Sequence, residues 1–181
     1  MNVLIACEES QEVCKAFRAK GHNAFSCDIQ ECSGGHPEWH IQRDVLTILN
    51  PKYHGNNTLD SIWFITSDGS CHEVPKWDLI IAHPPCTDLA VSGARHFERK
   101  RKDGSQQRSI DFFMRFTDIE CDKVAIENPV CIMSSIYRKQ ESIVHGFMEE
   151  HICAGAMPHT VSPQLIAAIL LAADDSYTAL I

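Results

Sequence analysis

The first part of the chain alternates between short apolar runs and one amphipathic segment. Residues 2–6 form an apolar run that predicts a strand. Residues 10–20 carry apolar side chains at helical spacing, and Gly21 then predicts the end of that helix. Residues 22–27 predict a second strand, which ends at Asp28. This order of strand, helix and strand is typical of the opening of a Rossmann-like parallel sheet.

Two further runs predict strands that are buried on both faces. Residues 78–82 are almost entirely aliphatic, and the cluster His83-Pro84-Pro85 ends the run abruptly. Residues 123–126 form the second run, and the helical spacing of residues 105–118 predicts the crossover between the two. We therefore expect a single α/β domain over residues 1–181, a length sufficient for one substantial core.

The segments between these elements predict loops and one hairpin. Residues 30–42 are rich in Gly, Ser, His and Pro and predict a loop. Residues 61–66 and 71–74 flank Asp68-Gly69, a dipeptide that favours the tight turn of a β-hairpin. We interpret this hairpin as an insertion before the strand at residues 78–82.

Chemically capable side chains follow the two buried runs. Cys86 comes after two prolines, which stiffen the chain, and Glu127 follows the second run directly. Ligands of open α/β sheets bind outside the carboxyl ends of the strands, so both side chains are expected to face a site. Arg95 and the basic residues after it are expected to lower the pKa of the Cys86 thiol. The alternative is a buried structural cysteine and a surface carboxylate.

Two tripeptides at these strand ends resemble the catalytic motifs of DNA (cytosine-5) methyltransferases. They are Pro84-Pro85-Cys86 and Glu127-Asn128-Pro129, and the resemblance covers residues 1 to 140 well. It implies an S-adenosylmethionine-dependent, Rossmann-like methyltransferase fold. It also implies that Cys86, presented by Pro85, attacks C6 of a cytosine, that Glu127 holds the N3 and N4 edge, and that Asn128 braces the turn.

The same resemblance assigns a cofactor site to the first two strand ends. Ala6, Cys7 and Ser10 stand where the family has a glycine-rich turn, and Ser10 is expected to cap the helix and leave backbone donors for the cofactor's carboxylate. Asp28 would accept hydrogen bonds from the ribose hydroxyls, and Asp44 would accept one from the adenine amino group. Each aspartate is alternatively an ordinary loop residue. Pro84 is also assigned to the cofactor side.

A basic run after Cys86 is the candidate contact with DNA phosphates. The net charge of −8 opposes DNA binding, but residues 95–108 carry six basic and two acidic side chains. The alternative is a solvated basic loop. Because the target base must be flipped out of the duplex, residues 87–105 are expected to form a mobile loop hinged at Ser92-Gly93. The proposed phosphate contacts are Arg95, Arg99, Lys100, Arg101 and Lys102.

The tail matches the family only in part. Residues 157–169 resemble its last motif, with a helix expected at residues 163–173; a plain core helix is the alternative. The stretch between Pro129 and Gly155 is too short for a separate target-recognition domain, and the family's Gln-x-Arg-x-Arg motif is missing. We therefore expect a minimal methyltransferase, or a non-catalytic DNA- or nucleotide-binding relative on the same fold.

Several other classes are disfavoured. No apolar stretch reaches the length of a membrane span and the N-terminus does not resemble a signal peptide, so we expect no membrane partner and a cytoplasmic location, where the nine cysteines would be reduced. A zinc site built from Cys27, Cys32, His36 and His40 would have unusually close spacing, and no metal is expected. No Gly-x-Gly-x-x-Gly follows the first strand, which disfavours a dinucleotide-dependent oxidoreductase. Methylation of RNA or of a free nucleotide remains open.

Overall fold

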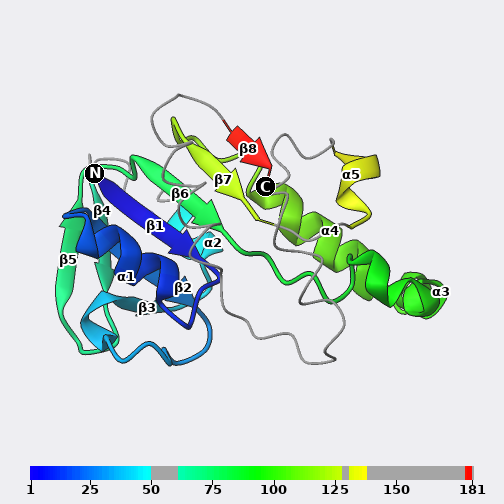
Figure 1. The fold of residues 1–181 in the computed structure, drawn as a ribbon, viewed down its shortest axis with the longest axis horizontal. Helices are drawn as coiled ribbons and strands as arrows, with labels where there is room; N and C mark the ends of the chain where they lie inside the picture. Colours follow the sequence, from blue (N-terminus) through cyan, green and yellow to red (C-terminus); the bar gives the residue numbers. More distant parts are fainter. Residues whose placement is uncertain (50–60, 128–130, 138–177, 181) are drawn as a thin grey trace.

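The protein is an α/β structure built on a parallel sheet (Figure 1). The computed structural model describes residues 1–49, 61–127, 131–137 and 178–180. Six strands form the sheet in the order β3-β2-β1-β6-β7-β8, and every neighbouring pair is parallel. Their bounds are Asn2–Ala6 for β1, Asn23–Asp28 for β2, His40–Gln42 for β3, Leu79–Ala82 for β6, Val124–Ile126 for β7 and Thr178–Leu180 for β8.

Within the described residues, the helices are short except for two. The longer ones are α1 (Glu12–Ala19) and α4 (Ser105–Arg115), and both were predicted from apolar spacing. The shorter ones are η1 (Pro37–Trp39), α2 (Leu46–Leu49), η3 (Val91–His96), α3 (Phe97–Lys102) and α5 (Met133–Ile136), of which η1 and η3 are 3₁₀ helices. The strand predictions at residues 2–6, 22–27, 78–82 and 123–126 are confirmed.

Each face of the sheet packs against a different part of the chain. Val3 and Ile5 of β1 contact the apolar side of α1, whose Phe17 is fully buried. Leu4 of β1 belongs to the opposite cluster, which includes Phe113 of α4. Residues 79–82 are buried throughout, as expected for a strand covered on both faces. The sheet therefore exposes its strand ends more than its faces.

The predicted hairpin is present. Strands β4 (Ile62–Ile65) and β5 (Cys71–Val74) pair in antiparallel register, and Gly69 in the turn has a φ of 88°. Phe64 of β4 packs edge-on against Phe25 of β2, with ring centroids 4.8 Å apart. The hairpin thus covers part of the sheet and forms a separate two-stranded unit.

Two predicted loops contain regular structure. The loop expected at residues 30–42 ends in η1 and β3, because buried His40 bonds Ser26 of β2 (Nδ1 to Oγ, 2.9 Å) and thereby adds a strand to the sheet. Residues 87–105 are also mostly helical: η3 and α3 continue into α4 as an arm that extends from the carboxyl edge of the sheet (Figure 1). An isolated bridge between Ala90 and Cys131 holds the base of this arm. The prediction of a loop at residues 87–105 is therefore wrong, whereas its movement over DNA stays a prediction.

Among its described residues, the tail contributes strand β8, which was not predicted. Strand β8 pairs with β7 in parallel register. The helix expected at residues 163–173 lies outside the described residues. Over the parts of the chain that the structure describes, no helix is long and apolar enough to cross a membrane.

Candidate active site

The carboxyl ends of β1, β6 and β7 meet where the strand order of the sheet reverses. Strand β1 pairs with β2 on one side and β6 on the other, and open α/β sheets bind ligands at such a switch point. The Ala6 carbonyl oxygen accepts the His83 N–H at 2.9 Å, and the Ala82 carbonyl oxygen accepts the Glu127 N–H at 2.9 Å. The backbone therefore fixes where His83 and Glu127 leave the sheet.

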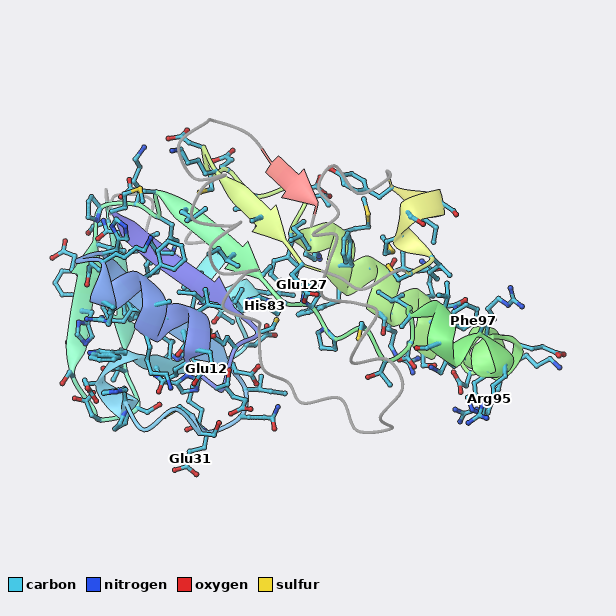
Figure 2. The ribbon with its side chains drawn as sticks, in the orientation of Figure 1. Glu12, Glu31, His83, Arg95, Phe97 and Glu127 are labelled. Atoms are coloured by element: carbon cyan, nitrogen blue, oxygen red, sulfur yellow. The ribbon has the colours of Figure 1, made fainter. Side chains whose placement is uncertain are left out.

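Cys86 lies close enough to Glu127 for their charges to interact. The thiol is partly buried, and its carbonyl oxygen accepts the N–H groups of Leu89 and Ala90, each at 2.9 Å. Burial raises the pKa of Cys86 and the Glu127 carboxylate raises it further. The expected lowering by Arg95 is wrong, since Arg95 is exposed on the helical arm, away from the sheet (Figure 2).

His83 is a functional candidate that the sequence reasoning missed. Its Nδ1 lies 3.5 Å from Glu127 Oε2, and its side chain is only 10% exposed. Its Nε2 is buried and has no hydrogen-bond partner among the described residues. Figure 2 shows His83 and Glu127 together at the carboxyl edge. The sequence feature that could have indicated His83 is its position between a buried strand and two prolines.

Cys131 is a second residue near the site that the sequence did not indicate. It is 6% exposed and pairs with the Ala90 backbone as a bridge. Burial raises its pKa, with smaller contributions from Cys86 and Glu127. It therefore lies near both predicted catalytic side chains. Asn128, which was also predicted to take part in catalysis, lies outside the described residues.

The turn after β1 contains non-glycine residues in left-handed conformations, where the resembled family has a glycine-rich turn. Cys7 has a φ of 60° and Gln11 a φ of 61°, values that non-glycine residues rarely adopt. The fully buried Gln11 amide holds its own conformation by bonding the backbone of His36 twice, with Nε2 to the carbonyl oxygen at 2.8 Å and Oε1 from the N–H at 3.0 Å. Gly34 packs so tightly here that an added Cβ would lie 2.5 Å from the Gln11 Cβ.

Glu8, and not Ser10, satisfies the start of α1. Gln11 is the N-cap residue, and the buried Glu8 carboxylate accepts the N–H of Val13 at 2.6 Å and of Cys14 at 3.3 Å. The predicted cap at Ser10 is therefore wrong. Two of the backbone donors at this helix start, which were expected to meet the cofactor's carboxylate, are already engaged by Glu8. Burial raises the pKa of Glu8 despite these hydrogen bonds.

Asp28 and Asp44 lie around Cys7 and also serve their own loops. Asp28 Oδ1 accepts the N–H of residue 30 at 2.9 Å, and Asp44 Oδ1 accepts the N–H of residue 46 at 3.0 Å. Burial raises the pKa of Cys7 to about 12, and both aspartates contribute to that rise. Each carboxylate therefore has the ordinary loop role that was the alternative, and each is also close enough to Cys7, which follows buried Ala6, to affect its pKa. Cys7 is not a reactive thiol.

The basic residues of the arm differ in exposure. Arg95, Arg99, Arg101 and Lys102 are exposed, and Lys102 pairs with Glu98 across one turn of α3. Lys100 is instead 6% exposed, with its Nζ 3.1 Å from Asp88 Oδ1 and bonded to the Thr87 carbonyl oxygen. The prediction that Lys100 contacts DNA phosphate is wrong for this structure, because its charge is engaged inside the protein.

A pocket of about 330 Å³ opens beside the candidate nucleophile. Buried Pro84 and exposed Pro85 precede Cys86, and Pro85 forms one wall of this pocket. Its remaining lining residues come from the loop after β6 and from α4: Asp88, Ser105, Arg108, Ser109 and Phe112. The pocket combines an aromatic ring with an arginine, groups that suit a stacked base and a phosphate.

Among the residues weighed for a zinc site, His40 has both ring nitrogens occupied by other partners. Both His40 nitrogens are engaged, Nδ1 by Ser26 Oγ and Nε2 by the Gln30 carbonyl oxygen, each at 2.9 Å. Within the described part of the chain, no group of three or more His, Cys, Asp or Glu side chains is arranged to hold a metal ion.

Comparisons with known proteins return no match. No family model matches the chain, no curated protein sequence matches it, and no solved structure matches its fold.

Proposed function

We propose that the protein methylates C5 of cytosine in DNA, using S-adenosylmethionine and a covalent Cys86 adduct. The observation that carries the proposal is the proximity of Cys86 and Glu127 at the switch point of the sheet, where β6 and β7 end side by side. Their order in the chain and their proline-rich flanks resemble the catalytic motifs of DNA (cytosine-5) methyltransferases. We also propose that the parallel sheet is a methyltransferase variant of the Rossmann-like fold.

In the proposed reaction, the Cys86 thiolate adds to C6 of the base and makes C5 nucleophilic. Glu127 holds the N3 and N4 edge, and Asn128 braces the turn that presents it. The charge of Glu127 opposes thiolate formation in the free protein. If Glu127 takes up a proton from solvent as the base binds, its carboxyl can donate a hydrogen bond to N3 and no longer opposes the thiolate, which becomes easier to form. Base binding and activation of the nucleophile would then be coupled.

The described residues fit one half of the cofactor better than the other. Asp28 and Asp44 offer carboxylate oxygens for the ribose hydroxyls and the adenine amino group, near the end of β1. The methionine half finds no free N–H at Val13 or Cys14, because Glu8 accepts both. When bound, S-adenosylmethionine would supply the methyl group for C5 and leave as S-adenosylhomocysteine; loss of the C5 proton to a base and expulsion of the Cys86 thiolate from C6 would then release the methylated cytosine. The reduced thiols that this chemistry needs agree with the predicted cytoplasmic location.

The exposed cations of the arm would contact the DNA backbone. Arg95, Arg99, Arg101 and Lys102 lie on one short stretch of chain that follows Cys86. The target base must leave the stack, at a cost of a few kcal/mol. The pocket walled by Pro85 and Phe112 would receive a neighbouring nucleotide, with Arg108 near its phosphate.

A second candidate is a DNA- or nucleotide-binding relative that does not transfer methyl groups. The specific observation in its favour is Glu8, whose carboxylate occupies the start of α1 where an anionic ligand group was expected. Such a protein would bind nucleic acid without forming a covalent adduct. Methylation of RNA or of a free nucleotide would retain Cys86 and Glu127 in the roles proposed here.

The deciding experiment traps the adduct. Purified protein is incubated with DNA that contains 5-fluorocytosine, with and without S-adenosylmethionine, because fluorine at C5 blocks the final elimination. We expect a shifted band that needs the cofactor and that is lost in Cys86→Ala. Cys71→Ala is the matched control, since Cys71 is exposed on the hairpin. Binding of DNA without any adduct would favour the non-catalytic candidate.

A further inference from the structure

We propose that His83 is a positioning residue for Glu127, and that its Nδ1–H holds one carboxylate oxygen so that the other faces the ligand. The identity of that ligand as cytosine rests on the proposed function, whereas the contact between the two side chains does not. No role was assigned to His83 from the sequence.

The backbone gives His83 little freedom. Its N–H bonds the Ala6 carbonyl oxygen at 2.9 Å, which ties the residue to β1. Pro84 follows it and disfavours helical backbone angles at the preceding residue. The side chain is only 10% exposed, so the surrounding atoms also limit rotation of the ring. A rigid donor is what a positioning residue requires.

The contact specifies which ring nitrogen carries a proton. An ionised Glu127 carboxylate only accepts hydrogen bonds, so His83 Nδ1 must be the donor across the 3.5 Å gap. This is a long hydrogen bond, and such contacts often tighten when a ligand closes the site. Nε2 is buried without a partner among the described residues. An unsatisfied buried nitrogen is costly, and proteins tolerate such groups chiefly where they serve a function.

A second carboxylate lies on the other loop at this edge. The charge of His83 lowers the pKa of Glu8, against the larger rise that burial causes. Glu8 is itself fixed by the N–H groups of Val13 and Cys14. His83 therefore contacts Glu127, which follows β7, and interacts electrostatically with Glu8, which follows β1.

A matched set of variants tests the role in catalysis. Asn at position 83 keeps an N–H near the place of Nδ1, Gln extends an amide toward the place of Nε2, and Leu removes both. We expect His83→Leu to lower kcat/KM for methyl transfer to DNA by about 10- to 100-fold, the range for residues that orient a ligating side chain. His83→Asn should recover most of that loss and His83→Gln should not. Equal activity in all three variants, or no recovery with Asn, would overturn the proposal.

A measurement without turnover separates this inference from the proposed function. The ring nitrogens of His83 are observed by NMR in protein labelled with ¹⁵N-histidine, assigned with the His83 variants. We expect the Nδ1 signal to be that of a protonated, hydrogen-bonded nitrogen and to change in Glu127→Gln. Glu73→Gln is the control, because Glu73 lies on the exposed side of the hairpin. If the natural protein transfers no methyl group but this coupling is present, the proposed function fails and the positioning role stands; absence of the coupling overturns the positioning role.

Discussion

Replacing Lys100 by methionine should destabilise the protein, although Lys100 belongs to a run of basic residues that looks like a surface. Its ammonium is buried and lies 3.1 Å from Asp88 Oδ1. Breaking a fully buried ion pair by removing one partner costs roughly 3–5 kcal/mol. Asp88 is 25% exposed and keeps a hydrogen bond from Ser109 at 3.2 Å, so part of its charge remains solvated. We therefore expect a loss of about 2 to 3 kcal/mol for Lys100→Met.

The matched control lies two residues away on the same helix. Lys102 pairs with Glu98, but both side chains are more than 70% exposed, at 74% and 77%. Exposed pairs contribute roughly 0–1 kcal/mol, so Lys102→Met should change stability little. In a protein of this size, 1 kcal/mol shifts the melting temperature by about 2–4 °C. The two variants should thus differ clearly in thermal and denaturant unfolding.

A double-mutant cycle with Asp88→Asn identifies the cause of the loss. If the pair is responsible, the double variant should be less destabilised than the sum of the two single variants. Equal stabilities for Lys100→Met and Lys102→Met would refute the reasoning and would indicate that Lys100 is a solvent-exposed cation like Lys102. DNA binding supplies an independent readout, since losing a phosphate contact reduces the salt slope by about one. We expect that reduction for Lys102→Met and not for Lys100→Met.

Three further predictions concern the strand ends. Gly34→Ala should lower the free energy of unfolding by about 1–3 kcal/mol in denaturant titrations, because the new Cβ would lie 2.5 Å from the Cβ of Gln11 and overpack the turn. Gly93→Ala is the control and should change stability little, because the nearest atoms to its new Cβ lie at 3.7 Å. Burial raises the folded pKa of Glu8 above its ordinary 4.5, so the folded state binds more protons and stability should fall as pH rises above 4.5. Glu8→Gln should flatten that part of the profile; an unchanged slope would contradict the burial of an ionisable group. Alkylation of Cys86 by iodoacetamide, followed by peptide mass spectrometry, should have its midpoint above pH 9.0 and shift downward in Glu127→Gln; an upward shift would argue against their proximity.

The sequence predicted those parts of the fold that depend on local pattern. Continuous apolar runs identified β6 and β7, and the Asp-Gly dipeptide identified the hairpin turn. Strand β3 was missed because it has only three residues, and its pairing depends on a buried contact between His40 and Ser26. Contacts of that kind join distant positions and leave no periodic signal.

The sequence predicted which residues make up the candidate site better than it predicted their electrostatic interactions. The structure brings Cys86 and Glu127 to one edge, as the strand ends implied. The sequence could not show that Glu8 would turn back to the start of α1, or that Lys100 would be buried, because both depend on side-chain direction. Cofactor, substrate and reaction remain predictions.

The left-handed turn after β1 has a consequence for how the chain folds. A glycine at the position of Gln11 would adopt the conformation from local preference alone. Gln11 depends instead on hydrogen bonds to His36, which lies 25 positions further along the chain. Contacts of that separation require loop closure before they stabilise anything, which delays their formation. We therefore expect the turn to reach its final geometry only when the segment around Gly34 docks, so that this part of the site edge forms later than the local turns of α1.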